Sequence, residues 1–160
     1  MLRSLVGSEM CIRDRKKLAC TVLLIALAGC ASPQKSDSQI YQEATALYVT
    51  QLPAGQNSVS LPAVKIPSHG LLADNLAIAA GGGANATQLR NALSAARAAG
   101  DKGFLIIGSQ NGALDLVVIK NAVDSQDLSG MTILYSGDPG KSDAIRSAVE
   151  KANGEFQFIR

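Results

Sequence analysis

Phe104-Leu105-Ile106-Ile107 is an unbroken apolar run, and the polar turn Gly108-Ser109-Gln110-Asn111-Gly112 follows it directly. An apolar run without alternation is typical of a strand that is buried on both faces of a parallel sheet. Residues 113–123 come next and place Leu114 and Val118 at helical spacing. We therefore expect a buried strand, a turn and a helix in succession.

The same succession extends in both directions along the chain. The patterns predict strands at 76–80, 131–135 and 155–159 and helices at 87–99 and 141–153. Alternating strands and helices predict an α/β fold, here a small three-layer sandwich with a mostly parallel sheet of about four strands in βαβαβαβ order.

Two further elements precede this core. Residues 40–51 place Ile40, Ala44 and Tyr48 at helical spacing and predict a short amphipathic helix. Residues 59–66 have β-rich composition but contain Pro62, which cannot donate to a sheet ladder. We expect an edge strand or an extended arm there.

The N-terminal part has the layout of a secretory signal. Lys16-Lys17 precede the apolar run 18–27, and Ala28-Gly29-Cys30 follow. The run is too short for a bilayer core, which needs about 20 apolar residues. Leu27-Ala28-Gly29-Cys30 resembles the lipobox of bacterial lipoproteins. This resemblance implies cleavage before Cys30 and acylation of its thiol, and Ala31 in place of aspartate implies outer-membrane sorting.

These segments suggest a domain organisation. Residues 1–15 resemble a translated sequencing adaptor, so we treat them as an artefactual extension; a genuine N-terminal extension is the alternative. Residues 16–29 are then the signal peptide and residues 30–38 a lipidated tether. Residues 39–160 are expected to be a single α/β domain on the periplasmic side of the bacterial envelope. The alternative for the leader is a buried apolar strand or helix that ends in Cys30.

Charge and cysteine content exclude some partners and bonds for this domain. The whole chain carries a formal charge of +2, but removing residues 1–29 leaves ten basic and eleven acidic side chains. No basic patch survives, so we expect no nucleic-acid partner. Cys11 and Cys20 precede the cleavage point and Cys30 takes lipid, which leaves no disulfide.

Polar loops follow the expected strands, and ligands of parallel sheets bind beside such loops, where strand order reverses. The alternative is that these residues only cap helices and make turns. The possible ligand-edge residues are Gly82, Asn85, Ser109, Gln110, Asn111, Ser136 and Asp138.

Cofactor motifs are incomplete in this sequence. Gly81-Gly82-Gly83 and Gly140-Lys141-Ser142 match nucleotide-binding patterns only in part. No Cys/His cluster has zinc-ligand spacing, and the acidic residues are scattered singly. We therefore predict no nucleotide, no metal and no other cofactor.

Two alternatives carry a more specific chemistry. A small hydrolase would use Ser109 or Asp138, or both together with His69 as a triad. Leu93-Ser94-x-x-Arg97-Ala98 resembles part of the helix in OmpA-like peptidoglycan-binding domains, although Arg90 stands where that family has asparagine. Our leading hypothesis is a lipid-anchored accessory or binding module without catalysis, attached to the membrane and in contact with an envelope protein or peptidoglycan.

Overall fold

The computed structural model describes residues 35–52 and 60–160, and one compact unit extends from Ser36 to Arg160. The adaptor-like segment 1–15, the signal peptide 16–29 and the lipidation site Cys30 lie outside the described residues. The statements about them therefore stay predictions.

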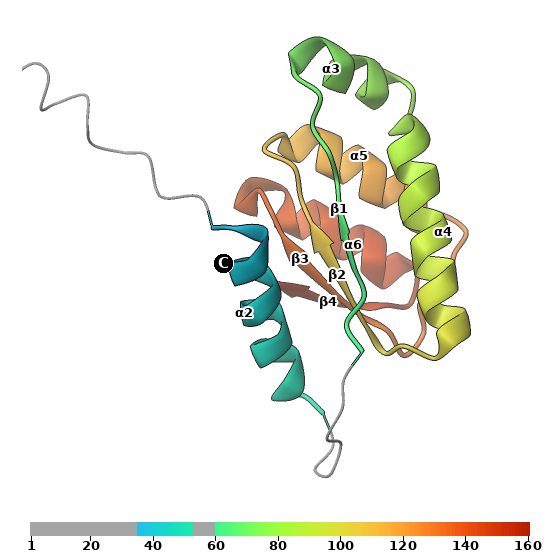
Figure 1. Cartoon of the computed structure of the whole chain (residues 1–160). Helices are drawn as coiled ribbons and strands as arrows, with labels where there is room; N and C mark the ends of the chain where they lie inside the picture. Colours follow the sequence, from blue (N-terminus) through green and yellow to red (C-terminus); the bar gives the residue numbers. More distant parts are fainter. Residues whose placement is uncertain (1–34, 53–59) are drawn as a thin grey trace, which may run out of the picture. The chain divides into compact units, whose positions relative to one another are not determined.

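Within the described residues, four parallel strands form one sheet: β1 (Ala63–Lys65), β2 (Gly103–Ile107), β3 (Thr132–Ser136) and β4 (Glu155–Phe158). Their spatial order is β1-β2-β3-β4, so each strand lies beside its sequence neighbour (Figure 1). The α/β prediction with about four strands is confirmed.

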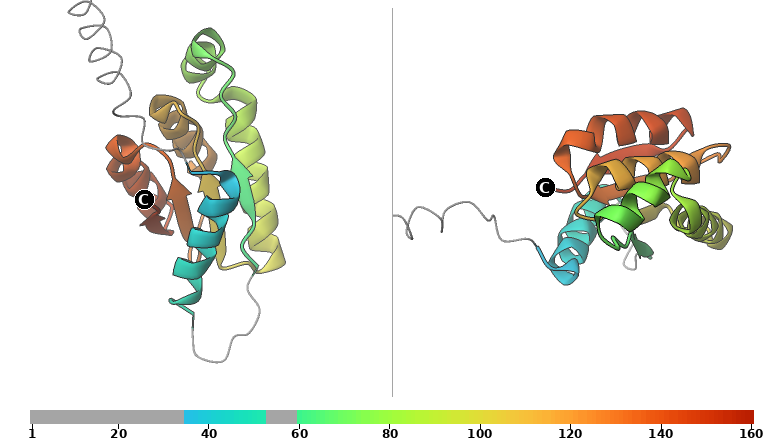
Figure 2. Two further views of the ribbon diagram at one scale, coloured as in Figure 1. Left: turned by 60° about the vertical axis from the view of Figure 1, so that its left-hand side comes forward. Right: turned by 90° about the horizontal axis from the view of Figure 1, so that it is seen from above.

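Helices cover both faces of this sheet and give the predicted three layers (Figure 2). One face packs against α2 (Asp37–Val49), and the other against α4 (Gly83–Ala99), α5 (Gly112–Val123) and α6 (Ser142–Lys151). Because the three successive crossovers use one face, the strand order does not reverse in the described sheet. The expected site at a reversal point is therefore corrected to a site along an unreversed edge.

The alternation of side chains along β2 produces two cores. Phe104 and Ile106 join the larger cluster beneath α4, α5 and α6, whereas Leu105 and Ile107 join the cluster beneath α2. All four side chains are at most 7 % exposed. Burial on both faces explains the continuous apolar sequence of this strand.

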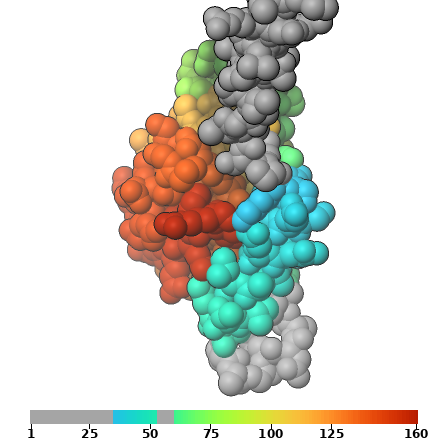
Figure 3. All heavy atoms as spheres, turned by 90° about the vertical axis from the view of Figure 1, so that its left-hand side faces the viewer, coloured from blue at the N-terminus to red at the C-terminus, as the bar shows by residue number. Residues whose placement is uncertain are grey.

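The α2 face is closed by the C-terminal end of the chain. Figure 3 shows the C-terminal residues beside α2, and the Gln51 Nε2 donates a 2.7 Å hydrogen bond to Gln157 Oε1. The helix begins one turn earlier than expected, because Ser36 accepts from the Gln39 amide and forms a capping box. Asp37 and Ser38, which the sequence places in the tether, therefore belong to α2.

The predicted strand at 76–80 is wrong. Residues 76–79 belong to α3 (Leu71–Ala79), and Ala80 is its C-cap. This helix packs against α5 at the end of the sheet where the strands finish (Figure 1). The segment is rich in alanine and leucine, which favour a helix. An apolar run of this length does not distinguish a strand from a helix by periodicity alone. The first strand is instead β1, directly after Pro62, in the segment predicted as an edge strand.

The other predicted elements are present with shifted ends. The helix expected at 87–99 begins at Gly83, and the helix expected at 141–153 is preceded by the 3-10 turn η1 (Pro139–Lys141). Among the residues described here, none of the helices is both long and apolar enough to cross a bilayer.

Candidate functional site

The carboxyl ends of the parallel strands gather several polar side chains at one edge of the sheet. The turn after β2 supplies Ser109 and Asn111, and the turn after β3 supplies Asp138. The loop between β1 and α3 reaches the same place, because Asn111 Nδ2 donates to Asp74 Oδ2 at 3.3 Å. These side chains connect to two buried ones, Asp115 and Tyr135. We name the connected set the carboxyl-edge cluster: Asp74, Ser109, Asn111, Asp115 and Tyr135.

Asp115, in the first turns of α5, is the centre of this cluster and is fully buried. Its Oδ1 accepts from the Ser109 amide at 2.8 Å and from Ser109 Oγ at 2.7 Å. Its Oδ2 accepts from the Tyr135 hydroxyl at 2.8 Å. One carboxylate therefore connects β2, β3 and α5 beneath the edge of the sheet.

Burial is the largest influence on the pKa values of Asp115 and Tyr135. It raises the pKa of Asp115 above its ordinary value, although the hydrogen bonds from Ser109 and Tyr135 act in the opposite direction. Burial, followed by the Asp115 charge, raises the pKa of Tyr135 far above its ordinary value. The phenol therefore stays protonated and continues to donate to the carboxylate.

Glycines make room for this arrangement. A Cβ at position 108 would lie 2.3 Å from Asp115 Oδ2, and a Cβ at position 137 would lie 2.2 Å from the Tyr135 hydroxyl oxygen. Both distances are shorter than any van der Waals contact allows. Gly108 and Gly137 are thus required for packing around the buried carboxylate.

Asp74 forms the second part of the cluster and is only 3 % exposed. It accepts from Ser68 Oγ at 2.6 Å and from the His69 amide at 2.9 Å. These two hydrogen bonds, that from Ser68 first, hold the pKa of Asp74 below its ordinary value. Asp74 thereby fixes the loop before α3 to the turn that follows β2.

Asn111 and Asp138 act mainly as local caps. Asn111 Oδ1 accepts from the Leu114 amide at 3.3 Å and begins α5, and Asp138 Oδ1 accepts from the Gly140 amide at 2.9 Å. Ser136 contributes its backbone carbonyl, which accepts from the Gly108 amide at 2.7 Å. Such contacts match the alternative of capping and turn residues.

The arrangement does not assemble a hydrolytic triad. Ser109 Oγ donates to Asp115 and accepts from the Asn111 amide at 3.1 Å, so its proton is directed to a buried carboxylate. Within the described part of the chain, no hydrogen bond joins the His69 ring to Ser109 or Asp138. His69 contributes its backbone amide to Asp74 instead.

Two predicted site residues lie elsewhere. Gly82 and Asn85 belong to the connection between α3 and α4 and to the first turn of α4, not to a loop after a strand. A Cβ on Gly82 would lie 3.0 Å from Val118 Cα, so this glycine permits close packing on α5. The incorrect strand at 76–80 led to their placement at the carboxyl edge. Gln110 is at that edge and is exposed.

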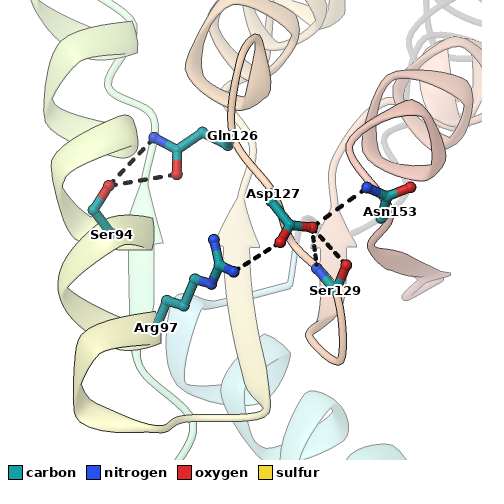
Figure 4. A network of polar contacts seen from close by, with 6 residues as sticks. All are labelled: Ser94, Arg97, Gln126, Asp127, Ser129 and Asn153. Atoms are coloured by element: carbon teal, nitrogen blue, oxygen red, sulfur yellow. Dashed lines mark hydrogen bonds and ion pairs between the residues drawn. The ribbon is translucent and has the colours of Figure 1, made fainter.

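The residues behind the peptidoglycan resemblance contact other elements of the same chain. Arg97 pairs with Asp127 at 2.8 Å, and Ser94 exchanges hydrogen bonds with Gln126 (Figure 4). Arg90 donates to the backbone carbonyls of Asn121 and Ala122. These side chains join α4 to the C-terminal end of α5 and the loop before β3.

The sequence did not reveal Asp74, Asp115 and Tyr135 as members of the cluster. A signal was present, because each aspartate is the only acidic residue of a helix that is mostly apolar. An acid in such a position is rarely buried without partners. Among the described residues, no three His, Cys, Asp or Glu side chains are grouped so that they could hold a metal ion.

Two shallow hollows flank the sheet. One of about 390 Å³ lies at the start of α2 and includes Asp37, Tyr41 and Ile107. The other, of about 360 Å³, lies between the edge strand β1 and α4 and is lined mainly by Pro62, Val64 and the alanines of α4. The second is the more apolar in its residues and follows an unpaired sheet edge.

Comparison with known proteins adds no family to this description: no protein-family model, no curated protein and no solved structure matches the chain.

Proposed function

We propose that this chain is a lipid-anchored accessory module of the bacterial envelope, which binds a partner on the periplasmic side and catalyses no reaction. The proposal combines the lipobox-like segment ending at Cys30 with the chemistry of the carboxyl edge. The observation that carries the non-catalytic part is the Ser109 hydroxyl. It donates to the buried Asp115 at 2.7 Å, in a bond that holds the turn after β2.

A nucleophilic serine needs a base that takes its proton and a carbonyl-binding position beside it. Here the oxygen that accepts from Ser109 Oγ also accepts the Ser109 amide at 2.8 Å. One property of Asp115 would suit a general base: burial raises its pKa, so it accepts a proton more readily. The carboxylate is, however, fully buried among Ser109, Tyr135 and Gly108, and this geometry supports a structural role for the Ser109 hydroxyl.

The free edge of β1 supports a protein partner. Within the described sheet β1 pairs only with β2, and Ala63 and Lys65 are exposed. The apolar hollow beside it offers space for alternate side chains of an added strand. Extended peptides bind to sheet edges in this way, with main-chain hydrogen bonds and shallow side-chain pockets.

A turnover assay tests the non-catalytic part. Purified chain is incubated with ester, amide and phosphoester substrates, beside Ser109→Ala and the matched variant Ser136→Ala at the same edge. We expect no turnover above buffer for any of the three. Turnover by the wild type that is lost in Ser109→Ala and kept in Ser136→Ala would show a hydrolase instead.

A crosslinking experiment tests the partner surface. A photoreactive amino acid replaces the exposed Ala95 beside the hollow, or the exposed Glu150 on α6 as the control. We expect a crosslinked envelope protein from native membranes with the first variant only. Co-sedimentation with purified peptidoglycan distinguishes the cell-wall alternative, and mass spectrometry of the detergent-extracted chain tests acylation at Cys30.

A further inference from the structure

The helix α3 has an inverted distribution of side chains. Its three leucines are the most exposed large apolar side chains of the described residues: Leu71 is 79 % exposed, Leu72 84 % and Leu76 73 %. Its only charged residue, Asp74, is 3 % exposed. A helix that stabilises a soluble domain normally buries its leucines and exposes its acids.

The fold does not depend on these leucines. The helix is held by Asp74, which accepts from Ser68, His69 and Asn111, and by Ala77 and Ile78, which pack on the larger core. At its C-terminal end, Asn121 Nδ2 donates to the Gly81 carbonyl at 2.9 Å. The leucine face is therefore exposed, and such apolar patches are typical of interaction sites.

The chain segment that carries this face contains almost no charge. From Gly70 to Leu89 the only charged residue is Asp74, which is buried. Protein interfaces usually have a polar rim around their apolar centre. A long uncharged segment with protruding leucines is better suited to the interfacial region of a bilayer, where apolar side chains insert among acyl chains.

The described domain begins at the same edge of the sheet as α3. Lys65, the last residue of β1, pairs with Asp37 in the first turn of α2 at 2.7 Å. The start of α2 therefore lies beside the carboxyl end of β1. Only residues 66–70 separate that point from α3, which lies at this end of the sheet in Figure 1 and in the left view of Figure 2.

The length of the tether limits the distance to the membrane. Cys30 precedes Ser36 by six positions, which span at most about 20 Å when fully extended. The 17 residues of α4, which lead away from α3, have a length of about 25 Å. An acylated Cys30 thus keeps the carboxyl edge near the bilayer, with the far end of α4 farther away.

We propose that α3 is a second membrane contact, in which Leu71, Leu72 and Leu76 insert into the bilayer interface beside the acylated N-terminus. This inference rests on the lipid anchor of the proposed function. It adds an orientation: the carboxyl edge faces the lipid, and the free edge of β1 stays accessible to a partner.

The experiment uses the full chain, produced in bacterial membranes and reconstituted in vesicles of phosphatidylethanolamine and phosphatidylglycerol. An environment-sensitive fluorophore is attached through Leu72→Cys, or through Ala99→Cys at the far end of α4 as the matched control. Leu76→Cys provides a second position on the same face. Flotation measures attachment to the vesicles, and spin-labelled phospholipids report depth by quenching.

We expect all three variants to float and the dyes at positions 72 and 76 to be quenched at least about threefold more than the dye at position 99. Flotation with equal, weak quenching at all three positions would overturn this inference and leave the anchor intact. A blue-shifted but unquenched dye at position 72 would also overturn it, in favour of a second copy or another protein. A chain that does not float would refute the anchor itself, and the inference with it.

Discussion

Asp115 and Asp127 each accept several hydrogen bonds, but they lie at opposite ends of the sheet and in opposite environments. Asp115 is fully buried at the carboxyl edge, and its donors are Ser109 and Tyr135. Asp127 lies in the loop before β3 with a side chain 51 % exposed, and it accepts from Ser129, Asn153 and Arg97 (Figure 4). The two carboxylates therefore accept similar hydrogen bonds, one in the buried interior and the other at the surface.

The pKa values of the two carboxyls show the difference. Burial raises the pKa of Asp115, whereas the hydrogen bonds from Ser129 lower the pKa of Asp127 to about 2. Water already solvates the Asp127 carboxylate, so its partners add little net stability. The donors of Asp115 would be left without water if this carboxylate were removed. We therefore expect the carboxyl edge to control the stability of the domain.

The largest effect is expected from Asp115→Ala. This change leaves the Ser109 amide and the Tyr135 hydroxyl without their acceptor in a buried site, and it opens a cavity. We expect the free energy of unfolding to fall by about 3 kcal/mol. Urea unfolding followed by circular dichroism measures it. The matched variant Asp127→Ala should shift the midpoint much less, and equal shifts would contradict the comparison.

The second-largest loss of stability is expected from Tyr135→Phe, which removes one donor to the buried carboxylate and keeps the ring. We expect a loss of about 2 kcal/mol in the free energy of unfolding, because Asp115 loses a hydrogen bond in a site that water does not reach. Tyr41→Phe is the control, since Tyr41 is exposed and its hydroxyl donates a partly buried hydrogen bond to the Leu61 carbonyl at 3.2 Å. It should cost about 0.5 kcal/mol. A Tyr135→Phe variant as stable as this control would show that Asp115 does not need the phenol.

The two central strands could be predicted from sequence because they are short and mostly apolar, as buried strands are. Residues 104–107 and 131–135 each match a strand within one residue at either end. The parallel arrangement then placed Ser109, Asn111 and Asp138 at one edge. This step required only the alternation of strands and helices, which fixes where the loops after strands gather.

The features that could not be predicted depend on contacts between residues that are far apart in the sequence. Asp115 and Tyr135 are 20 positions apart, and Asp74 and Asn111 are 37 positions apart. Each aspartate stands out among apolar neighbours, but nothing local in the sequence shows which distant residue it contacts, so the centre of the cluster was not predicted. The helix α3 was predicted as a strand for a related reason: its inner side combines Asp74 with only two apolar residues that pack on the core, Ala77 and Ile78, so no regular apolar stripe marks it as a helix. Gly82 and Asn85 were misplaced as a consequence.

A smaller effect is expected when pH changes the two carboxyls in opposite directions. Asp127 has a lowered pKa in the folded state, so its contribution is complete above about pH 4 and is lost as pH falls towards about 2. Asp115 has a raised pKa, so its contribution is complete below the unfolded value of 3.8 and is lost as pH rises through the folded value. Unfolding at several pH values, for wild type, Asp115→Asn and Asp127→Asn, measures both signs.

We expect the stability difference between wild type and Asp127→Asn to shrink only below pH 4. The difference between wild type and Asp115→Asn should change in favour of the wild type as pH falls from neutral towards pH 4. Parallel pH profiles for the two variants would show that the two sites do not differ in this respect.

The smallest effect concerns which partner sets the pKa of Asp127. The Ser129 hydroxyl and amide are the strongest causes of its low pKa, and the exposed Arg97 is the weakest of its hydrogen-bonding partners. We therefore expect Ser129→Ala to raise this pKa towards its ordinary value, whereas Arg97→Gln should change it little. Titration of the Asp127 carboxyl carbon by NMR measures both. A larger shift in Arg97→Gln would mean that the ion pair, not the local turn, keeps this carboxylate charged. The loop before β3 would then be held to α4 mainly by charge.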